Sequence, residues 1–369
     1  MKILFLNTSK KGGAANAADR ISNSLSFFGH EVFFLTQNDF LDHGETKLIT
    51  SGLKRTKILL AKIICRLPQF FFKKSYVSTM LFGTLSVDQI NNSDFDIIHL
   101  NWVNSGFVSI NQIKMINKPM IWTIHDMWIT TGLRHVILEN TKLNIIERVL
   151  LSRNRKILNN LKNLHLVSPS RWLGEKINKR YDLPLSIIPN PVSTDASVSS
   201  GLKKEKSQIL FLHTSKDFHK GYDLLELALK EVALTHNIEL VTILKNIKKD
   251  INFAVKEIDY ITDETKLLDL ISSVKMVVVP SRVDNYPNIC LESLKCKVPV
   301  VAFSIGGIPE IISHNKTGYL ARPFDVSDFA NGINMILEDK IKLEFFENFE
   351  NSFEIGKMYN NIYEKVIKH

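Results

Sequence analysis

The sequence has few cysteines and no long apolar run, and both shortages limit what the protein can be. Its only cysteines, Cys65, Cys290 and Cys296, are too few for the paired framework of a small secreted domain. No run approaches the ~20 apolar residues that a membrane-spanning helix needs. The apolar segment at residues 3–6 is too short for the core of a signal peptide. We therefore expect a protein of the reducing cytoplasm that is neither secreted nor integral to a membrane.

The sequence also lacks the signatures of a nucleic-acid-binding module. It shows no zinc-ligand spacing and no basic stripe interleaved with stacking aromatic residues. The formal net charge of +9 therefore needs another explanation, and a phosphorylated substrate or an anionic membrane surface would account for it equally well. With 369 residues, of which 44% are hydrophobic, the chain is long enough for two globular domains. We expect no nucleic-acid partner.

A strand, a loop and a helix start occur twice between residues 277 and 318. The apolar run Val277–Val279 predicts a buried strand, and a helix follows from Asn288. A second strand, Val298–Phe303, is followed by a second predicted helix that opens at Pro309. In a parallel sheet both loops lie at the carboxyl ends of the strands, where α/β proteins bind ligands. Because helix N-termini offer free backbone N–H groups, the sequence predicts an anion site here.

Two acidic residues accompany this predicted anion site. Asp284 lies in the loop before the first helix, and Glu292 lies about two turns inside that helix. A carboxylate on the helix could accept hydrogen bonds from a ribose diol, and one in the loop could reach a hexose. Two solvated acids on a surface helix would give the same pattern, so the residues alone leave both interpretations open.

Taken together, these features resemble the signature of retaining glycosyltransferases of the GT-B fold, family 4. That signature has two glutamates separated by seven residues, then a strand and a Gly-Gly-x-Pro-Glu turn. Asp284 stands where the family usually has its first glutamate, and Glu292 matches the second. The turn is matched by Gly306, Gly307, Pro309 and Glu310. The resemblance covers nearly the whole chain and implies an α/β protein with two Rossmann-like domains facing a cleft.

The resemblance also divides the chain. Residues 1–192 are the expected acceptor-binding domain, against which a C-terminal helix at 355–369 packs back, as GT-B chains do. Residues 193–206 are polar with little periodicity and are the predicted linker. Residues 207–354 are the expected nucleotide-sugar-binding domain.

In the first domain, a predicted strand at residues 2–6 runs into Gly12 and Gly13 before a helix. Glycines in this position let the backbone approach a phosphate or an acceptor, although a plain tight turn would use the same residues. In the resembling family this loop faces the cleft, which favours a functional role.

His125 and Asp126 directly follow another predicted strand, at residues 120–124, and so belong to a carboxyl end. His125 could donate to a sugar hydroxyl or to the donor phosphate, whereas a satisfied loop histidine is the alternative. Relatives that build surface polysaccharides often carry His-Asp-x-Trp followed by Thr-Gly, as this chain does. The resemblance therefore makes His125 and Asp126, together with Asp284, the expected catalytic residues. The metal-binding cysteines of many such relatives are missing here, and no structural metal is expected.

The expected diphosphate loop follows a predicted strand at residues 209–212. Lys220, next to Gly221, matches the phosphate-binding lysine of the family, but the family's usual arginine is missing. Lys216 or His219 could replace it, although a lysine is a point charge and not a bidentate fork. A solvated loop lysine is the alternative interpretation of Lys220.

The helix after Asp284 supplies the other expected donor contacts. Pro287 has no N–H group, so Asn288 and Ile289 are the expected backbone donors to the diphosphate. The resemblance assigns Glu292 to the ribose and Asp284 to the transferred sugar.

Residues 53–80 carry several lysines and arginines among isoleucine, leucine and phenylalanine, and no acidic residue. A basic amphipathic segment of this kind suits an anionic membrane interface. An ordinary helix with its apolar face packed on a sheet would look similar. A second basic stretch at residues 142–162 could extend the same surface. We expect peripheral contact with the inner face of the plasma membrane.

The implied reaction is retaining transfer of a hexose-type sugar from a UDP- or GDP-sugar to a hydroxyl of a saccharide acceptor. The acceptor is expected to be lipid-linked, in bacterial capsule, O-antigen or exopolysaccharide synthesis. No cofactor and no metal are expected, because cationic side chains and helix dipoles can neutralise the phosphates. Two alternatives stay open: a GT-B nucleotide-sugar epimerase, and a non-catalytic nucleotide-sugar-binding partner subunit, which the aspartate at 284 and the missing arginine suggest.

Overall fold

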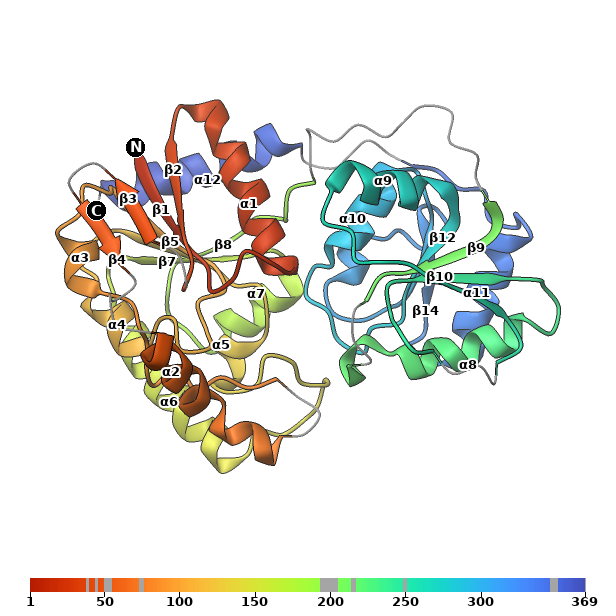
Figure 1. Ribbon diagram of the computed structural model, residues 1–369, viewed down its shortest axis with the longest axis horizontal. Helices are drawn as coiled ribbons and strands as arrows, with labels where there is room; N and C mark the ends of the chain where they lie inside the picture. Colours follow the sequence, from red (N-terminus) through yellow and green to blue (C-terminus); the bar gives the residue numbers. More distant parts are fainter. Residues whose placement is uncertain are drawn as a thin grey trace. The chain divides into compact units, whose positions relative to one another are not determined.

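The computed structural model describes residues 1–37, 40–43, 46–49, 55–72, 76–192, 205–213, 217–247, 251–345 and 351–368. The chain divides into two compact units (Figure 1). Unit 1 comprises Met1–Pro191 and Glu350–His369, and unit 2 comprises Val192–Phe349. Unit 1 thus ends at residue 191, where the sequence suggested 192. Most of the expected linker lies outside the described residues.

Unit 1 is built on a parallel sheet whose strands follow the order β2-β1-β5-β6-β7-β8. Most of its residues are apolar, and β1, β5 and β6 are almost wholly buried, as strands covered on both faces are. The chain moves from β1 outward to β2 and later returns to β5 on the other side of β1, so a topological switch point lies between β1 and β5. The strands are β1 (Lys2–Leu6), β2 (Glu31–Leu35), β5 (Ile97–Leu100), β6 (Met120–Thr123), β7 (Leu164–Ser168) and β8 (Leu185–Ile187).

The C-terminal helix α12 (Ser352–Ile367) returns to unit 1 and packs beside α1 (Gly13–Leu25) (Figure 1). Together they cover one face of the sheet, where Phe5 of β1 and Tyr363 of α12 share one apolar core. Gly356 makes the close approach of the helices possible, because a Cβ there would lie 2.3 Å from the carbonyl oxygen of Ser24. Docking of the last helix on unit 1 agrees with the expectation from the sequence.

The other elements of unit 1 surround this sheet. The helical ones are η1 (Ser26–Phe28), α2 (Arg55–Arg66), η2 (Leu67–Phe71), α3 (Val87–Asn91), α4 (Ile110–Met115), α5 (Trp128–Thr131), α6 (Ile145–Leu158) and α7 (Arg171–Asn178). A hairpin is formed by β3 (Phe40–His43) and β4 (Thr46–Ile49). The carboxylate of Glu147 on α6 is fully buried. Its two oxygens accept hydrogen bonds from Nε and Nη2 of Arg134, at 2.5 and 2.8 Å.

Unit 2 repeats the design with a parallel sheet in the order β11-β10-β9-β12-β13-β14. Its switch point lies between β9 and β12, because the chain leaves β9 toward β10 and β11 and then returns to β12 on the other side. The strands are β9 (Glu205–Phe211), β10 (Glu239–Thr242), β11 (Ala254–Glu257), β12 (Val274–Val279), β13 (Val300–Phe303) and β14 (Gly318–Ala321). The helical elements are η3 (Phe218–Lys220), α8 (Tyr222–Val232), α9 (Glu264–Ser273), α10 (Asn288–Lys295), η4 (Ile308–Glu310) and α11 (Val326–Leu337).

The two sheets confirm the α/β class, but one predicted element is wrong. The helix expected to open at Pro309 is only the three-residue 3-10 turn η4. The chain turns away after Ile312, and Asn315 adopts a left-handed backbone with φ of 59° before β14 begins. Turn-forming residues at 313–318 outweigh the helix-start signal of the proline. The predicted anion site therefore has one α-helix N-terminus, that of α10, and not two.

Helix α2 and η2 present an apolar surface to solvent. Phe70 and Phe71 are 81% and 83% exposed. On α6, Ile145 and Val149 are 67% and 61% exposed. Phe72, which follows η2, packs against a buried cluster of Val77, Leu133 and Leu150, the last of which belongs to α6. In the described part of the chain, no helix is both long enough and apolar enough to cross a bilayer.

Candidate functional site at the carboxyl ends of two sheets

In unit 2, the loops after β9 and β12 meet at the switch point without room for extra side-chain atoms. Gly221, at φ +71°, lies against the second loop, since a Cβ there would fall 1.9 Å from the carbonyl oxygen of Pro280. Gly306 has φ of +58°, and a Cβ there would likewise fall 1.9 Å from the carbonyl oxygen of Asp284. The carbonyl of Asp284 also accepts a hydrogen bond from the N–H of Gly307 at 3.1 Å. Three loops are therefore held in direct backbone contact around Asp284.

The side chain of Asp284 forms an ion pair with Lys220 at 2.8 Å. The hydroxyl of Ser281 donates to the same carboxylate oxygen at 3.3 Å. Both partners of the ion pair are partly exposed, with 22% of the Lys220 side chain and 15% of the Asp284 side chain accessible. Two residues predicted from the sequence as donor ligands, 64 positions apart, are thus brought together by the fold.

An arginine does occur at this switch point, at a position that the sequence did not single out. Arg282 donates through both terminal nitrogens to the two carboxylate oxygens of Asp223 at 2.7 Å each, and it also donates to the carbonyl oxygen of Phe218. Its guanidinium lies 4.1 Å from the centre of the Phe218 ring. The Asp223 pKa is lowered chiefly by this contact. Arg282 therefore clamps α8 to the loop after β12.

Two histidines belong to the loop after β9. His219 is half-buried in η3, and its carbonyl oxygen accepts a hydrogen bond from the N–H of Arg282 at 2.7 Å. Burial, followed by the charge of Lys220, lowers the pKa of His219. His213 follows β9, and the same two causes lower its pKa to about 4. Lys216, the other predicted replacement for the missing arginine, lies outside the described residues.

Helix α10 begins at Asn288 and carries Glu292 in its second turn. Glu292 is only 5% exposed. Pro287 occupies the N-cap position and provides no side-chain cap, so Asn288 and Ile289 are the first two residues of the helix, as the sequence indicated. Beneath them, burial and then the negative charges of Asp284 and Glu292 raise the pKa of Cys290 well above its usual value.

In unit 1, the loops after β1 and β5 are also joined at the switch point. The N–H of Thr8 donates to the carbonyl oxygen of Trp102 at 2.8 Å, and the N–H of Trp102 donates to the side-chain oxygen of Asn7 at 2.9 Å. The Thr8 hydroxyl reaches the carbonyl oxygen of Asn104 at 2.9 Å. The segment before Gly12 and Gly13 is therefore fixed against the loop after β5.

His125 and Asp126 lie after β6, beside these loops. Nε2 of His125 lies 3.2 Å from the side-chain oxygen of Asn101. Burial lowers the pKa of His125 to about 4, although the Asp126 charge acts in the opposite direction. The imidazole is therefore neutral at pH 7 in the ligand-free protein.

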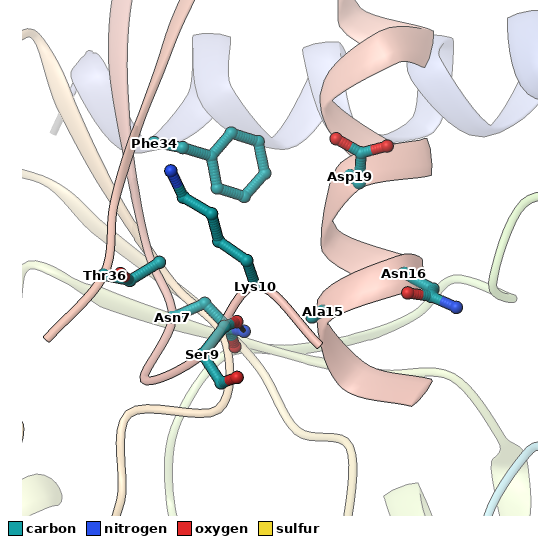
Figure 2. A pocket seen from close by; sticks show the side chains of 8 residues that line it. All are labelled: Asn7, Ser9, Lys10, Ala15, Asn16, Asp19, Phe34 and Thr36. Carbon is teal, nitrogen blue, oxygen red and sulfur yellow. Dashed lines mark hydrogen bonds between the residues drawn. The ribbon is translucent and has the colours of Figure 1, made fainter. Parts of the chain in front are cut away.

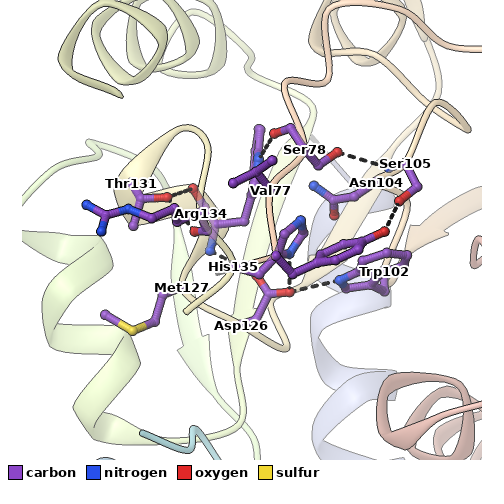
Figure 3. Close-up of polar contacts among 12 residues, drawn as sticks. Val77, Ser78, Trp102, Asn104, Ser105, Asp126, Met127, Thr131, Arg134 and His135 are labelled. Carbon is purple, nitrogen blue, oxygen red and sulfur yellow. Dashed lines mark hydrogen bonds and ion pairs between the residues drawn. The ribbon is translucent and has the colours of Figure 1, made fainter. Parts of the chain in front are cut away.

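Asp126 is surrounded by hydrogen-bond donors, as Figure 3 shows. One carboxylate oxygen accepts from Nδ1 of His135 at 2.6 Å and from the indole of Trp102 at 2.8 Å, and the other accepts from the N–H of Trp128 at 2.9 Å. Burial alone would raise the pKa of Asp126, but the charge and the hydrogen bond of His135, with the other donors, outweigh it and lower the pKa. Asp126 is thus an anion that orients an imidazole and an indole.

The aromatic group around Asp126 reaches the end of α2. The Tyr76 ring lies 5.0 Å from the His135 ring and 6.0 Å from the Trp102 ring. The hydroxyl of Tyr76 lies 2.5 Å from that of Ser105 and accepts a hydrogen bond from the guanidinium of Arg66. Arg66 is the last residue of α2, so Tyr76 links this helix to the rings of Trp102 and His135 that contact Asp126.

Two family models match successive parts of the chain. Residues 11–196 match the model described as Glycosyltransferase Family 4, and residues 193–352 match the model described as Glycosyl transferases group 1. The chain belongs to glycosyltransferase family 4. The two parallel sheets and the solved relatives below show that this glycosyltransferase has the GT-B fold.

The glycosyltransferase is similar to several known proteins. N-acetyl-α-D-glucosaminyl L-malate synthase of Bacillus anthracis is 25% identical over 397 residues, an alignment that covers 97% of this chain and 95% of that enzyme. Sucrose-phosphate synthase of Thermosynechococcus elongatus has a TM-score of 0.70 at 18% identity, with 100% of this chain and 99% of that one covered. Anabaena HepE in complex with UDP-glucose has a TM-score of 0.59 at 16% identity, with 100% and 98% covered.

A pocket of about 340 Å³ lies in unit 1 of the glycosyltransferase, beside the start of α1 (Figure 2). Gly12 has φ of 104° and is the N-cap of α1, where no side chain caps the helix. The pocket opens between the loop after β1, the first turns of α1 and the end of β2. Its lining residues are Asn7, Ser9, Lys10, Ala15, Asn16, Asp19, Phe34 and Thr36.

Within the described residues, no group of three or more histidine, cysteine, aspartate or glutamate side chains is arranged to hold a metal ion. The pair Asp94 and Asp96 precedes β5, at the end of the sheet opposite the switch point. Lys2 donates to both carboxylates, through its ammonium group and its backbone N–H respectively.

Three residues beside the switch points of the two units were given no role in the sequence-based prediction. His213 directly follows an apolar strand at a carboxyl end, the signal that singled out His125, so it could have been found in the same way. Arg282 and His135 carry no local signal, because their partners are 59 and 9 positions away in the sequence.

Proposed function

We propose that this glycosyltransferase moves a hexose-type sugar, with retention of anomeric configuration, from a UDP- or GDP-sugar to a hydroxyl of a saccharide acceptor. The observation that carries the donor half is the Lys220–Asp284 ion pair at the switch point of unit 2. In this proposal Lys220 neutralises the diphosphate, Asp284 binds the transferred sugar and Glu292 binds the ribose. The backbone N–H groups of Asn288 and Ile289 at the start of α10 add hydrogen bonds to the diphosphate.

The proposed reaction exchanges one bond at the anomeric carbon. The bond from that carbon to the diphosphate oxygen breaks, the acceptor oxygen forms the new bond on the same face, and the acceptor proton passes to the departing diphosphate. Lys220 and the N-terminus of α10 stabilise the charge that develops on the diphosphate, and no metal ion is required. His125, neutral at pH 7, hydrogen-bonds a sugar hydroxyl near the reacting carbon.

Thermal-shift measurements with nucleotide sugars test the donor half. A ligand that binds only the native state raises the melting temperature according to its affinity. UDP-glucose is the first donor to test because HepE was solved with it, and GDP-mannose is the second. Glu292→Gln should remove most of the shift, whereas Glu231→Gln, on the exposed face of α8, should keep it. An unchanged shift in Glu292→Gln would contradict the ribose assignment.

Product analysis separates this function from its alternatives. Release of nucleotide with a glycosylated acceptor supports transfer. A new sugar isomer formed from donor without acceptor would instead indicate an epimerase. Tight donor binding without turnover across a broad acceptor panel would indicate a non-catalytic partner subunit.

We further propose that the acceptor is lipid-linked and that the enzyme lies on the cytoplasmic face of an anionic membrane, in bacterial surface-polysaccharide synthesis. The exposed phenylalanines of η2 and the exposed apolar residues of α6 support this, together with Lys62 and Arg66 on α2. Phenylalanine side chains enter the acyl boundary while lysine and arginine meet anionic headgroups. Phe72 packs against the apolar cluster that includes Leu150 of α6, so η2 and α6 lie on the same side of unit 1.

Co-sedimentation with vesicles tests the membrane proposal. Vesicles containing phosphatidylglycerol should retain the protein at low salt, and pure phosphatidylcholine should retain much less. The double variant Phe70→Ser/Phe71→Ser should lose most of the binding. Leu234→Ser is the matched control, because this leucine is 77% exposed but belongs to unit 2. Equal binding of both variants to anionic vesicles would refute the assigned surface.

A further inference from the structure

The charged side chains around the proposed diphosphate site nearly cancel one another. In the described segments 217–223 and 280–288 the cations are Lys220 and Arg282, while the carboxylates are Asp217, Asp223 and Asp284, so the formal sum is 2 − 3 = −1. Lys220 is paired with Asp284 at 2.8 Å, and Arg282 is paired with Asp223 at 2.7 Å. These segments therefore hold no excess of positive charge before a ligand arrives.

A nucleotide sugar would bring two negative charges, one on each phosphate. Partly buried anions are costly unless positive charge or hydrogen bonds compensate them. Both described cations are shared with carboxylates, so Lys220 and the N–H groups at the start of α10 leave part of the added charge uncompensated, and a group that gains a proton would compensate it. Histidine is the side chain that gains a proton most readily near neutral pH.

His213 has the position that such a group needs. It follows β9 at the switch point, and its ring stacks on Phe211 with a centroid distance of 6.2 Å and an interplanar angle of 30°. The ring is half-buried, and its Nδ1 atom is buried without a hydrogen-bond partner. A buried nitrogen without a partner is unfavourable, and a polar atom of a bound ligand would satisfy it.

The charges that act on His213 come from both loops of the switch point. Asp217, His219 and Lys220 belong to the loop after β9, and Asp284 belongs to the loop after β12. Burial and then Lys220 hold the pKa of His213 at about 4, so the imidazole is neutral at pH 7. Phosphates that share the charge of Lys220 and add their own would act in the opposite direction and favour the imidazolium.

We propose that His213 is a diphosphate-binding residue and that it takes up one proton from solvent when a nucleotide sugar binds. This inference rests on the proposed function, since the ligand is the donor of that reaction. The imidazolium supplies the positive charge that the family's missing arginine would otherwise provide, and its N–H groups donate to phosphate oxygen.

Calorimetry measures the proton directly. UDP-glucose and GDP-mannose are the probes. Their two phosphates are esterified at both ends, so neither phosphate gains or loses a proton between roughly pH 5.5 and pH 8. Titrations at pH 6.5 in cacodylate and in imidazole buffer, whose ionisation enthalpies differ, give the number of protons taken up. We expect about 0.5 to 1 proton per ligand, and an affinity that rises by up to about tenfold for each unit of decreasing pH.

His213→Gln should abolish the proton uptake and flatten the pH dependence of the affinity. His213→Asn is a second variant, and the melting temperature of each checks that the fold is kept. His236→Gln is the matched control, because this histidine pairs with Glu338 elsewhere in unit 2 and should leave the uptake unchanged.

The outcomes separate the inference from the function on which it rests. Binding of a nucleotide sugar without proton uptake would overturn the inference alone. Uptake that is lost in His219→Gln but kept in His213→Gln would overturn the assignment to His213. Failure of UDP-, GDP-, ADP- and dTDP-sugars to bind at all would refute the proposed function, and the inference with it.

Discussion

Replacement of Gly221 by alanine should disrupt the contact between the loops after β9 and β12 in unit 2, although it adds only one methyl group. Gly221 has φ of +71°, a conformation that costs an L-residue about 1 kcal/mol. In addition, the new Cβ would lie 1.9 Å from the carbonyl oxygen of Pro280. An ordinary contact between these atoms is ~3.2 Å, so the loops after β9 and β12 would have to separate by more than ~1 Å. Overpacking of this kind costs about 1–3 kcal/mol, for a total of about 2–4 kcal/mol.

Gly29→Ala provides a matched control for this substitution. Gly29 has φ of +68°, but nothing lies within 4 Å of its Cβ position, so only the backbone penalty of about 1 kcal/mol applies. Urea denaturation compares the stabilities of the two variants, and thermal shift with UDP-glucose compares donor binding. Gly221→Ala should be less stable and should bind donor weakly, because the Lys220–Asp284 contact is displaced. Equal destabilisation of both variants, with donor binding kept, would refute the argument from loop contact.

Two further perturbations test the buried polar contacts of unit 1. Glu147→Gln should destabilise the protein by about 3–5 kcal/mol in urea denaturation, because it leaves the Arg134 guanidinium without its charge partner, and a loss below about 1 kcal/mol would contradict this. His99 is fully buried between Tyr363 and Thr123, and burial lowers its pKa to about 3. The unfolded chain binds a proton at this histidine below pH 6.5 while the native protein does not, so the His99 contribution to stability should fall by about 2 kcal/mol between pH 7 and pH 5. His99→Gln should show a correspondingly smaller acid loss in urea denaturation at the two pH values, and equal losses in both proteins would refute it.

The sequence predicted strands at residues 2–6, 120–124, 209–212, 277–279 and 298–303 because their signal is local, and each matches a strand of the two sheets. The run 277–279 is apolar and β-branched, and the structure extends it to β12 at residues 274–279. The carboxyl ends of such strands could also be predicted, which is why the sequence singled out Lys220, Asp284 and His125. The prediction of a helix at Pro309 was wrong because its local signal is ambiguous. Proline favours both a helix start and a short turn, and the residues that follow decide between them.

The partners of the site residues could not be predicted in the same way. Lys220 and Asp284 are 64 positions apart, and Arg282 and Asp223 are 59 apart, so their pairing depends on strand order and on backbone contact between loops. Sequence spacing within an element carries no information about such contacts. For the same reason, the missing arginine of the diphosphate loop was noticed, but the charge cancellation that gives His213 its proposed role was not.

The surroundings of two carboxylates predicted to be catalytic lead to different roles for them. Asp126 receives N–H groups from Trp102, Trp128 and His135, so a substrate hydroxyl would have to displace a donor that the fold holds in place. Asp284 is held by the flexible side chain of Lys220 and by a long contact from a serine hydroxyl. Lysine can swing toward a phosphate at little cost, since its ammonium is a point charge on four methylene groups. We therefore infer that Asp284 exchanges its partner for substrate, whereas Asp126 acts by positioning the imidazole and the indole beside it.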